Sequence, residues 1–161
     1  MAMVVVVSDN HGKRKVIENI YNAFKNDAIA FIHCGDSEMT PIELKDWHVV
    51  GGNNDYDGFE DELIVNVAGI RIFVCHGHLN SYFNREQELV QLAKKHNCQI
   101  VCSGHTHMMV FKKIDDIYFI NPGSLRYNRD GSLPSFAIIS FSKLDLSDIS
   151  VQFFKGSDYE K

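Results

Sequence analysis

Short, fully hydrophobic runs alternate with amphipathic stretches in the first third of the chain. Residues 3–7 are apolar at every position, which is typical of a strand buried on both faces. Apolar side chains then recur at helical spacing and predict a helix over 13–25, and a second short hydrophobic run follows at 28–32. A strand, a helix and a strand in this order predict parallel strands with a covering helix.

The middle of the chain continues the same alternation. Residues 40–43 (Thr-Pro-Ile-Glu) have the pattern of a capping box with proline at the first helical position, so a short helix is expected to start there. Residues 68–69 (Ala-Gly) are expected to form the turn of a hairpin. The other elements predicted in this part are strands at 48–50, 63–67, 70–75 and 100–102, with a helix over 83–96.

The C-terminal third is predicted to be antiparallel, with strands near 108–114, 117–120, 135–141 and 149–154. Parallel units followed by a meander predict two mixed sheets that pack face to face, with helices on the outer faces. No internal repeat, charge block or linker interrupts this pattern. Residues 1–161 are therefore expected to form one α/β domain.

Composition narrows the classes of function. Of the 161 residues, 45% are hydrophobic, which is enough for a continuous core and excludes a disordered chain. A net charge of −5 opposes extensive nucleic-acid binding, because phosphate contacts usually need a basic surface. No apolar stretch approaches the roughly 18 residues that cross a bilayer. The four cysteines form no CxxC pair, so we expect a cytoplasmic protein with buried, reduced thiols.

Polar residues that can bind metals gather directly after the predicted strands. Nearly every apolar strand ends in a glycine-containing turn that carries histidine, aspartate or asparagine. Because ligands bind outside the carboxyl ends of the strands in open α/β sheets, these turns point to one crevice. The five turns lie at 8–12, 33–36, 51–55, 75–78 and 103–107.

The donor types in these turns favour two divalent ions. Aspartate and asparagine oxygens with neutral imidazoles suit Mn, Fe, Ni, Co or Zn, whereas a thiolate site would need clustered cysteines. Seven candidate donors exceed what one tetrahedral ion takes, so two ions that share a carboxylate are the economical interpretation. Two ions about 3.5–4 Å apart can clamp a phosphoryl group and activate a water molecule.

The order of these motifs resembles the signature of the calcineurin-like metallophosphoesterases. It runs Asp9-x-His11, Gly35-Asp36, Gly52-Asn53, His76 and Gly104-His105-x-His107, and continues into residues 121–124 (Asn-Pro-Gly-Ser). The pattern is most similar to the small subgroup of phosphodiesterases that includes YfcE and the relatives of Vps29. The resemblance implies a four-layer αββα sandwich of two mixed sheets flanked by helices.

The resemblance also implies a role for each matched residue. Asp9, His11 and His107 would hold the first ion. Asn53, His76 and His105 would hold the second ion. Asp36 would bridge the two ions, and Asn53 would also touch the substrate phosphate. The cofactor expected is two divalent ions per chain, with Mn as the first expectation and Fe, Ni, Co or Zn as alternatives.

The activity expected from this site is hydrolysis of a small phosphoester, most simply a phosphodiester. A hydroxide that bridges the two ions would attack phosphorus in line. Two alternatives stay open, namely a phosphomonoesterase (phosphatase) and a non-catalytic protein-interaction scaffold of the Vps29 type. All seven ligand positions hold competent residues, which favours the enzyme. The phenylalanine-rich C-terminal strands are interpreted as core, with a homo-oligomer interface as the alternative.

One residue departs from the family pattern. Many members carry histidine directly after the metal-binding asparagine, where it helps to protonate the leaving group. This chain has Asn54 there, and an amide cannot supply a proton at neutral pH. His78, two residues after His76, either substitutes as the proton donor, supports a metal ligand without binding the ion, or faces solvent. The presence of Asn54 counts more strongly against hydrolysis of phosphomonoesters than against hydrolysis of phosphoesters in general.

Four further residues are open to a structural interpretation. His33 and His48 lie in or beside predicted strands, and we expect both to be structural. Arg126 and Arg129 follow the Asn-Pro-Gly-Ser turn. They either meet a substrate phosphate or lie on the surface.

Overall fold

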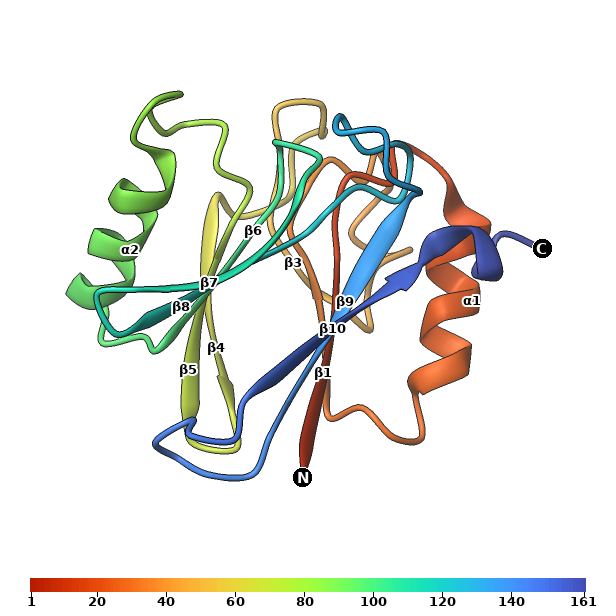
Figure 1. Cartoon of the computed structure of the whole chain (residues 1–161). Coiled ribbons are helices and arrows are strands. Elements are labelled where there is room, and N and C mark those ends of the chain that lie inside the picture. Colours follow the sequence, from red (N-terminus) through yellow and green to blue (C-terminus); the bar gives the residue numbers. More distant parts are fainter.

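The computed structural model describes residues 1–161 and contains two five-stranded mixed sheets that face each other, with one α-helix on each outer side (Figure 1). The strand orders are β10-β9-β1-β2-β3 and β4-β5-β6-β8-β7. The sequence prediction of an α/β fold with two mixed sheets flanked by helices is therefore confirmed.

The first sheet is built around a parallel β–α–β unit. Strand β1 (Ala2–Val7) pairs in parallel with β2 (Ala30–His33), and α1 (Arg14–Phe24) connects them. The short strand β3 (His48–Val49) extends the sheet beyond β2. On the other side, β9 (Ser135–Phe141) and β10 (Ser150–Lys155) add two antiparallel strands.

The second sheet is also mixed, with three parallel strands in the middle and one antiparallel strand at each edge. Strands β4 (Glu62–Val67) and β5 (Ile70–Cys75) form the predicted hairpin. Helix α2 (Arg85–Lys95) then leads to β6 (Ile100–Ser103), which pairs in parallel with β5. Strand β8 (Ile117–Pro122) pairs in parallel with β6, and β7 (Met109–Ile114) pairs antiparallel with β8 at the edge of the sheet. A 3-10 helix that the sequence did not predict, η1 (Gly156–Tyr159), ends the chain.

The hydrophobic side chains form one core between the sheets and one beneath each helix. In β1, Val4 and Val6 belong to the central core, whereas Val5 and Val7 belong to the core under α1. A strand buried on both faces explains why residues 3–7 are apolar at every position. The third core lies under α2, around Phe73.

The short helix predicted from Thr40 is wrong. The capping box forms, since the Thr40 amide donates to Glu43 Oε2 at 2.7 Å, but residues 41–46 make only turns. The amide of Leu44 is shared between the carbonyls of residues 40 and 41. Trp47 must then pack edge-on against Phe31, and β3 begins at the next residue, so the chain has no room for a second helical turn.

The four cysteines are buried and free, as the sequence predicted. Neither α-helix nor the terminal 3-10 helix has the length and hydrophobicity needed to cross a bilayer.

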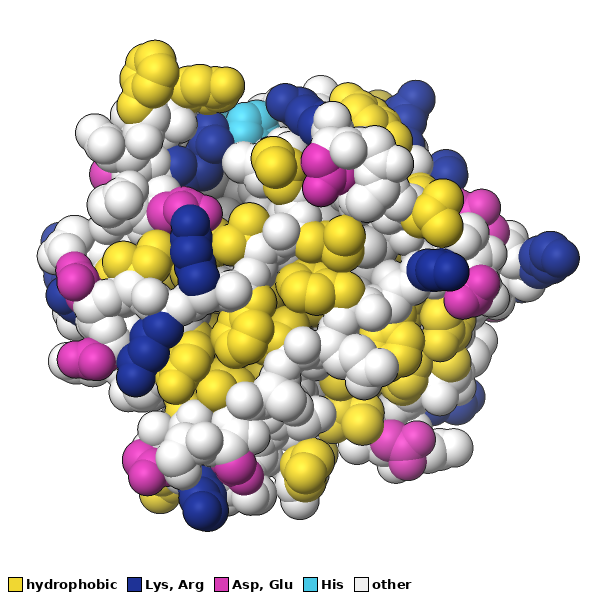
Figure 2. Space-filling view, in the orientation of Figure 1, with side chains coloured by type: hydrophobic (Ala, Val, Ile, Leu, Met, Phe, Trp, Pro, Cys, Tyr) yellow, Lys and Arg dark blue, Asp and Glu magenta, His cyan; other side chains and the backbone are white.

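Hydrophobic side chains reach the surface between the edge strands β7 and β10, where Phe111 is 40% exposed and Phe153 is partly buried (Figure 2). The homo-oligomer interface, given as the alternative to core for the C-terminal strands, stays a prediction.

His33 is a structural residue with a fixed proton position. It is fully buried at the end of β2, its Nδ1 accepts from the Gly35 amide at 3.0 Å, and its Nε2 lies 2.7 Å from Asn10 Oδ1. This pairing requires the neutral ring, with the proton on Nε2. Burial lowers the pKa of His33 to about 4. His48, by contrast, is exposed on β3.

We predict that His33 makes folding stability depend on pH. Its pKa in the folded state lies below the unfolded value, so its contribution is complete above about pH 6.5 and is lost as the pH falls toward 4. The loss should approach about 3 kcal/mol in the free energy of unfolding. Urea unfolding of the parent and of His33→Gln between pH 7 and pH 4 measures the difference. His48→Gln is the control and should keep the parent profile; an unchanged profile in His33→Gln would contradict the assignment.

Candidate metal centre

The loops at the carboxyl ends of four strands bring the predicted donors to one edge of the paired sheets. Asp9 follows β1, Asp36 follows β2, His76 follows β5, and His105 and His107 follow β6. This is the arrangement that the strand-end turns predicted. Residues separated by nearly a hundred positions therefore meet at one buried cluster.

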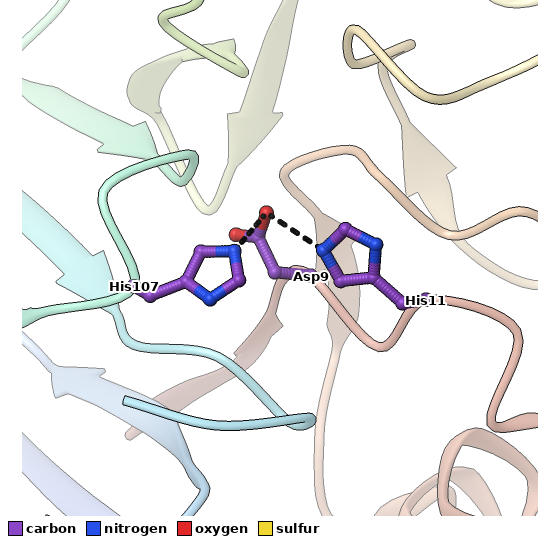
Figure 3. Close-up of side chains that lie close together, drawn as sticks. All are labelled: Asp9, His11 and His107. Atoms are coloured by element: carbon purple, nitrogen blue, oxygen red, sulfur yellow. Dashed lines mark ion pairs between the residues drawn. The ribbon is translucent and has the colours of Figure 1, made fainter. Parts of the chain in front are cut away.

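Asp9 lies at the centre of the first donor group. Its Oδ1 is 3.3 Å from His107 Nε2 and 3.8 Å from His11 Nε2, and the two rings face the carboxylate from opposite sides (Figure 3). Both histidine side chains are nearly buried, and Asp9 is fully buried. These three side chains place one donor atom each within 4.8 Å of one another, which is close enough to hold an ion.

A second donor group shares Asp9. It consists of Asp9, Asp36 and His76, again with donor atoms within 4.8 Å. His76 Nε2 lies 3.3 Å from Asp36 Oδ2 and 3.8 Å from Asp9 Oδ1. Asp36 Oδ2 also lies 3.8 Å from His11 Nε2 of the first group. Both carboxylates therefore stand between the two groups.

The remaining predicted residues surround the second group. Asn53 is exposed, and its Oδ1 lies 3.1 Å from His76 Nε2. The His105 ring packs edge-on against His76 with centroids 5.1 Å apart, and the His78 ring is 5.4 Å from His76. The structure thus brings all eight predicted site residues together, although Asn53, His78 and His105 fall outside the two close donor groups.

Backbone and acidic partners orient three of the imidazoles. His76 Nδ1 donates to the Cys34 carbonyl at 2.7 Å, and His107 Nδ1 donates to the Tyr127 carbonyl at 3.0 Å. His11 Nδ1 lies 2.9 Å from Glu38 Oε2. When Nδ1 carries the proton, the lone pair of Nε2 points into the cluster and is free for an ion.

The close charges shift the pKa values of the cluster. Burial raises the pKa of Asp9, but His107, His76 and Ser8 outweigh it and leave the pKa lowered. Asp36 is also buried, yet His76 and Asn54 hold its pKa far below the usual range. Burial, helped by His76 and Arg85, lowers the pKa of His105 to about 4. Ionised carboxylates and neutral imidazoles are the forms that bind metals.

Two buried atoms of the cluster have no partner within the protein. Asp9 Oδ1 and His11 Nε2 are buried without a hydrogen bond. Burying a carboxylate oxygen in this way is costly unless a cation neutralises it. The donors are oxygen and imidazole nitrogen, the set that suits divalent transition ions. The residues present therefore fit the divalent ions that the motifs implied.

The cluster needs glycine at two places where backbones approach closely. A Cβ at Gly35 would lie 2.8 Å from His76 Nδ1, and φ there is +101°. A Cβ at Gly104 would collide with the Ser8 hydroxyl and lie 2.8 Å from Asp9 Oδ2. A side chain at either position would displace a ligand, which explains the glycine beside each of these donors.

Asp55 and Asn54 hold Asp36 in place, a role that the sequence motifs did not predict. The Asp55 carboxylate accepts from the backbone amides of Asp36, Glu38 and Gly52 at 2.7–2.8 Å. Asn54 donates to Asp36 twice, through its backbone amide to Oδ1 and its side-chain amide to Oδ2, both at 2.9 Å. An aspartate three residues after a glycine in a turn is the available signal, since such residues bond nearby amides.

The chain belongs to the calcineurin-like phosphoesterase superfamily, whose domain matches residues 2–144. It is 31% identical over 160 residues to a Bacillus subtilis protein named Probable metallophosphoesterase YsnB, covering 98% of this chain and 93% of that one. It is 33% identical over 164 residues to a protein of Mycoplasma genitalium also named Probable metallophosphoesterase, covering 98% of each. A protein of Methanocaldococcus jannaschii, 24% identical over 91% of this chain and 98% of its own, is named as a phosphodiesterase.

Solved structures show the same fold. A crystal structure of a conserved Streptococcus pneumoniae protein, a predicted phosphoesterase, has a TM-score of 0.88 at 27% identity and covers 97% of this chain and 90% of that one. Vps29 of Entamoeba histolytica in complex with Zn²⁺ has a TM-score of 0.71 at 22% identity over 96% and 99%. The phosphoesterase YfcE of Escherichia coli has a TM-score of 0.65 at 21% identity over 94% and 98%. The predicted resemblance to this subgroup is confirmed.

We predict that Asp55→Ala weakens metal binding although Asp55 is not one of the predicted donors. Losing its bonds to three backbone amides frees the loop that carries Asp36, and outer partners of this kind are worth about 10–100-fold in metal affinity. Titration calorimetry of the metal-free protein with Mn²⁺ measures the change. Asp57→Ala, an exposed aspartate of the same loop, is the control and should bind as the parent does. Equal affinities in all three proteins would refute the positioning role.

Proposed function

We propose that this protein is a dimetal-dependent phosphodiesterase. The observation that carries the proposal is Asp9, whose buried and unpartnered Oδ1 is common to both donor groups. Asp36 is within reach of His11 and of His76, which supports the bridging role assigned to it. Two adjacent ions that share carboxylates are the arrangement used for in-line displacement at phosphorus.

The residues that would hold the ions follow from the two groups. Asp9, His11 and His107 would hold the first ion. Asp36, His76, Asn53 and His105 would complete the second site. Bound divalent ions supply charge neutralisation for the phosphoryl oxygens and lower the pKa of coordinated water. Mn²⁺ stays the first expectation, with Fe, Ni, Co or Zn as alternatives, because all suit oxygen and imidazole donors.

The residues around the cluster would position the ester and handle its protons. Asn53 is exposed beside His76, so its amide can donate to a phosphate oxygen at the open side of the cluster. His78 has a buried and unpartnered Nδ1, and burial together with His76 lowers its pKa. A lowered pKa favours the neutral ring over the imidazolium, which supports esters whose leaving groups need little protonation.

Asn54 supports the choice of a diester over a monoester. Its side-chain amide is engaged with Asp36 Oδ2, so it acts on the carboxylate and has no acidic proton for a leaving group. A monoester with an alkyl leaving group depends on a general acid more than an activated diester does. The M. jannaschii relative named as a phosphodiesterase points to the same substrate class.

The scaffold alternative is less well supported. Several Vps29 structures share the fold at identities that say nothing of function. The donor set of this chain is complete at every predicted position, which favours the enzyme. The proposal includes a small phosphoester as the substrate and the cytoplasm as the location of the protein.

We predict that chelation abolishes hydrolysis of bis(p-nitrophenyl) phosphate and that Mn²⁺ or a similar ion restores it. The reason is that the proposed nucleophile is a water whose pKa only bound divalent ions would lower. The rate is followed at 405 nm, with metal content measured in the same samples. Turnover that persists in protein shown to be metal-free would rule out the mechanism.

We predict that the parent prefers activated aryl diesters to alkyl monoesters and that Asn54→His narrows the preference. A histidine at this position adds a proton donor, and general acid assistance is typically worth about 10²–10⁴-fold. The ratio of turnover on the two esters is measured at equal metal occupancy.

Asn54→Ala is the matched control for that substitution. It removes the bond to Asp36 Oδ2 without adding an acid, so it should slow both esters and leave their ratio unchanged. A parent that already prefers alkyl monoesters would overturn the argument from Asn54.

A further inference from the structure

A cavity opens beside the metal centre and shares a wall with it. Its volume is about 340 Å³, and it is lined by Tyr82, Arg85, His105, Thr106, Met108 and Arg129. His105 packs against His76, so the cavity begins one ring away from the second donor group. No acidic side chain lines it. In Figure 2, basic side chains lie on both sides of an exposed histidine at the upper edge of the molecule.

Both arginines of this cavity are tied to the backbone next to metal ligands. Arg85 Nε donates to the carbonyl of Gly77 at 2.9 Å, and Gly77 directly follows His76. The backbone amide of Arg129 donates to the carbonyl of His107 at 3.0 Å. These bonds fix the positions of the two residues relative to the cluster.

The guanidinium groups themselves have no carboxylate partner. Neither Arg85 nor Arg129 takes part in an ion pair, and the acidic residue next to Arg85, Glu86, is paired with Lys112 at 2.5 Å. Arg14, by contrast, is paired with Glu43. In a chain with net charge −5, two unpaired arginines in one cavity are free to bind an anion.

We propose that this cavity binds a second phosphate group of the substrate, so that the protein acts on phosphoesters that carry two phosphates. The inference rests on the proposed function, because the scissile phosphate must occupy the metal centre. Two guanidinium groups match the charge of about −1.5 to −2 on a terminal phosphate, and their donors fit its oxygens. Tyr82 and Met108 add an apolar wall beside the arginines, which suits the sugar or base of a nucleotide.

The test uses two chromogenic diesters with the same scissile bond. Both are p-nitrophenyl esters of thymidine 5′-phosphate, one with a free 3′-hydroxyl and one with a 3′-phosphate. In the parent, the 3′-phosphate should raise kcat/KM, mainly by lowering KM. Arg129→Gln and Arg85→Gln should each reduce this advantage by about tenfold or more, because a hydrogen-bonded charge pair is lost.

Arg126→Gln is the matched control. Arg126 is exposed in the same loop as Arg129 but does not line the cavity, so the advantage should stay at the parent value. The advantage in the parent should also shrink with added salt, since it depends on charge. An equal kcat/KM for both esters in the parent would overturn the proposal. A loss in Arg126→Gln as large as in Arg129→Gln would also overturn it.

Binding separates this inference from the proposed function. Calorimetry of the Mn²⁺-loaded protein compares thymidine 3′,5′-bisphosphate with thymidine 5′-phosphate. Tighter binding of the bisphosphate to the parent, lost in Arg129→Gln, supports the subsite even if neither ester is hydrolysed, in which case only the proposed function fails. Equal binding of the two nucleotides would reject the subsite whatever the activity.

Discussion

The buried carboxylate of Asp9 is the constraint on which the rest of the site depends. Oδ2 is satisfied by the Ser8 hydroxyl at 2.6 Å and the His105 amide at 3.1 Å, but Oδ1 has no hydrogen-bond partner. Leaving such a charge buried costs several kcal/mol unless positive charge stands beside it. Three imidazole Nε2 atoms surround Oδ1 at 3.3–3.8 Å, each from a different loop, so a cation that they hold would also neutralise this oxygen. The chain must bring all these loops together in order to bury one carboxylate.

The backbone near the cluster shows what this convergence requires. Five of the seven predicted ligands have a backbone φ between +44° and +71°. They are Asp9, His11, Asp36, His105 and His107. A non-glycine residue in this region costs about 1–3 kcal/mol and persists only where its surroundings fix it. Here the loops fix one another, since the amide of Asp9 donates to Gly35 O and that of His11 donates to Asp36 O. The strain is held by pairing between loops that β1 and β2 place side by side.

Much of this could be predicted from the sequence because the strongest signals are local. Fully apolar runs marked β1 and β2, and donor residues directly after strands marked the edge at which the loops meet. The predicted helix from Thr40 does not form because Trp47 packs against Phe31 and β3 begins at the next residue. Neither constraint is visible in the residues of the predicted helix itself. Asp55 was missed for a related reason. Its place three residues after Gly52 points only to the Gly52 amide, whereas the amides of Asp36 and Glu38 come from another loop and carry no side-chain signal.

Arginine side chains without a carboxylate partner lie beside the metal centre. Of the five arginines, Arg14 is paired with Glu43 and Arg71 donates to the carbonyl of His96, while the other three have no carboxylate partner. Two of those three, Arg85 and Arg129, line the cavity that shares His105 with the cluster. An acidic protein that leaves unpaired guanidinium groups at one rim creates a local field that draws anions there. Arg85 at the start of α2 and Arg129 in the loop after β8 thus place positive charge beside the cluster that buries Asp9.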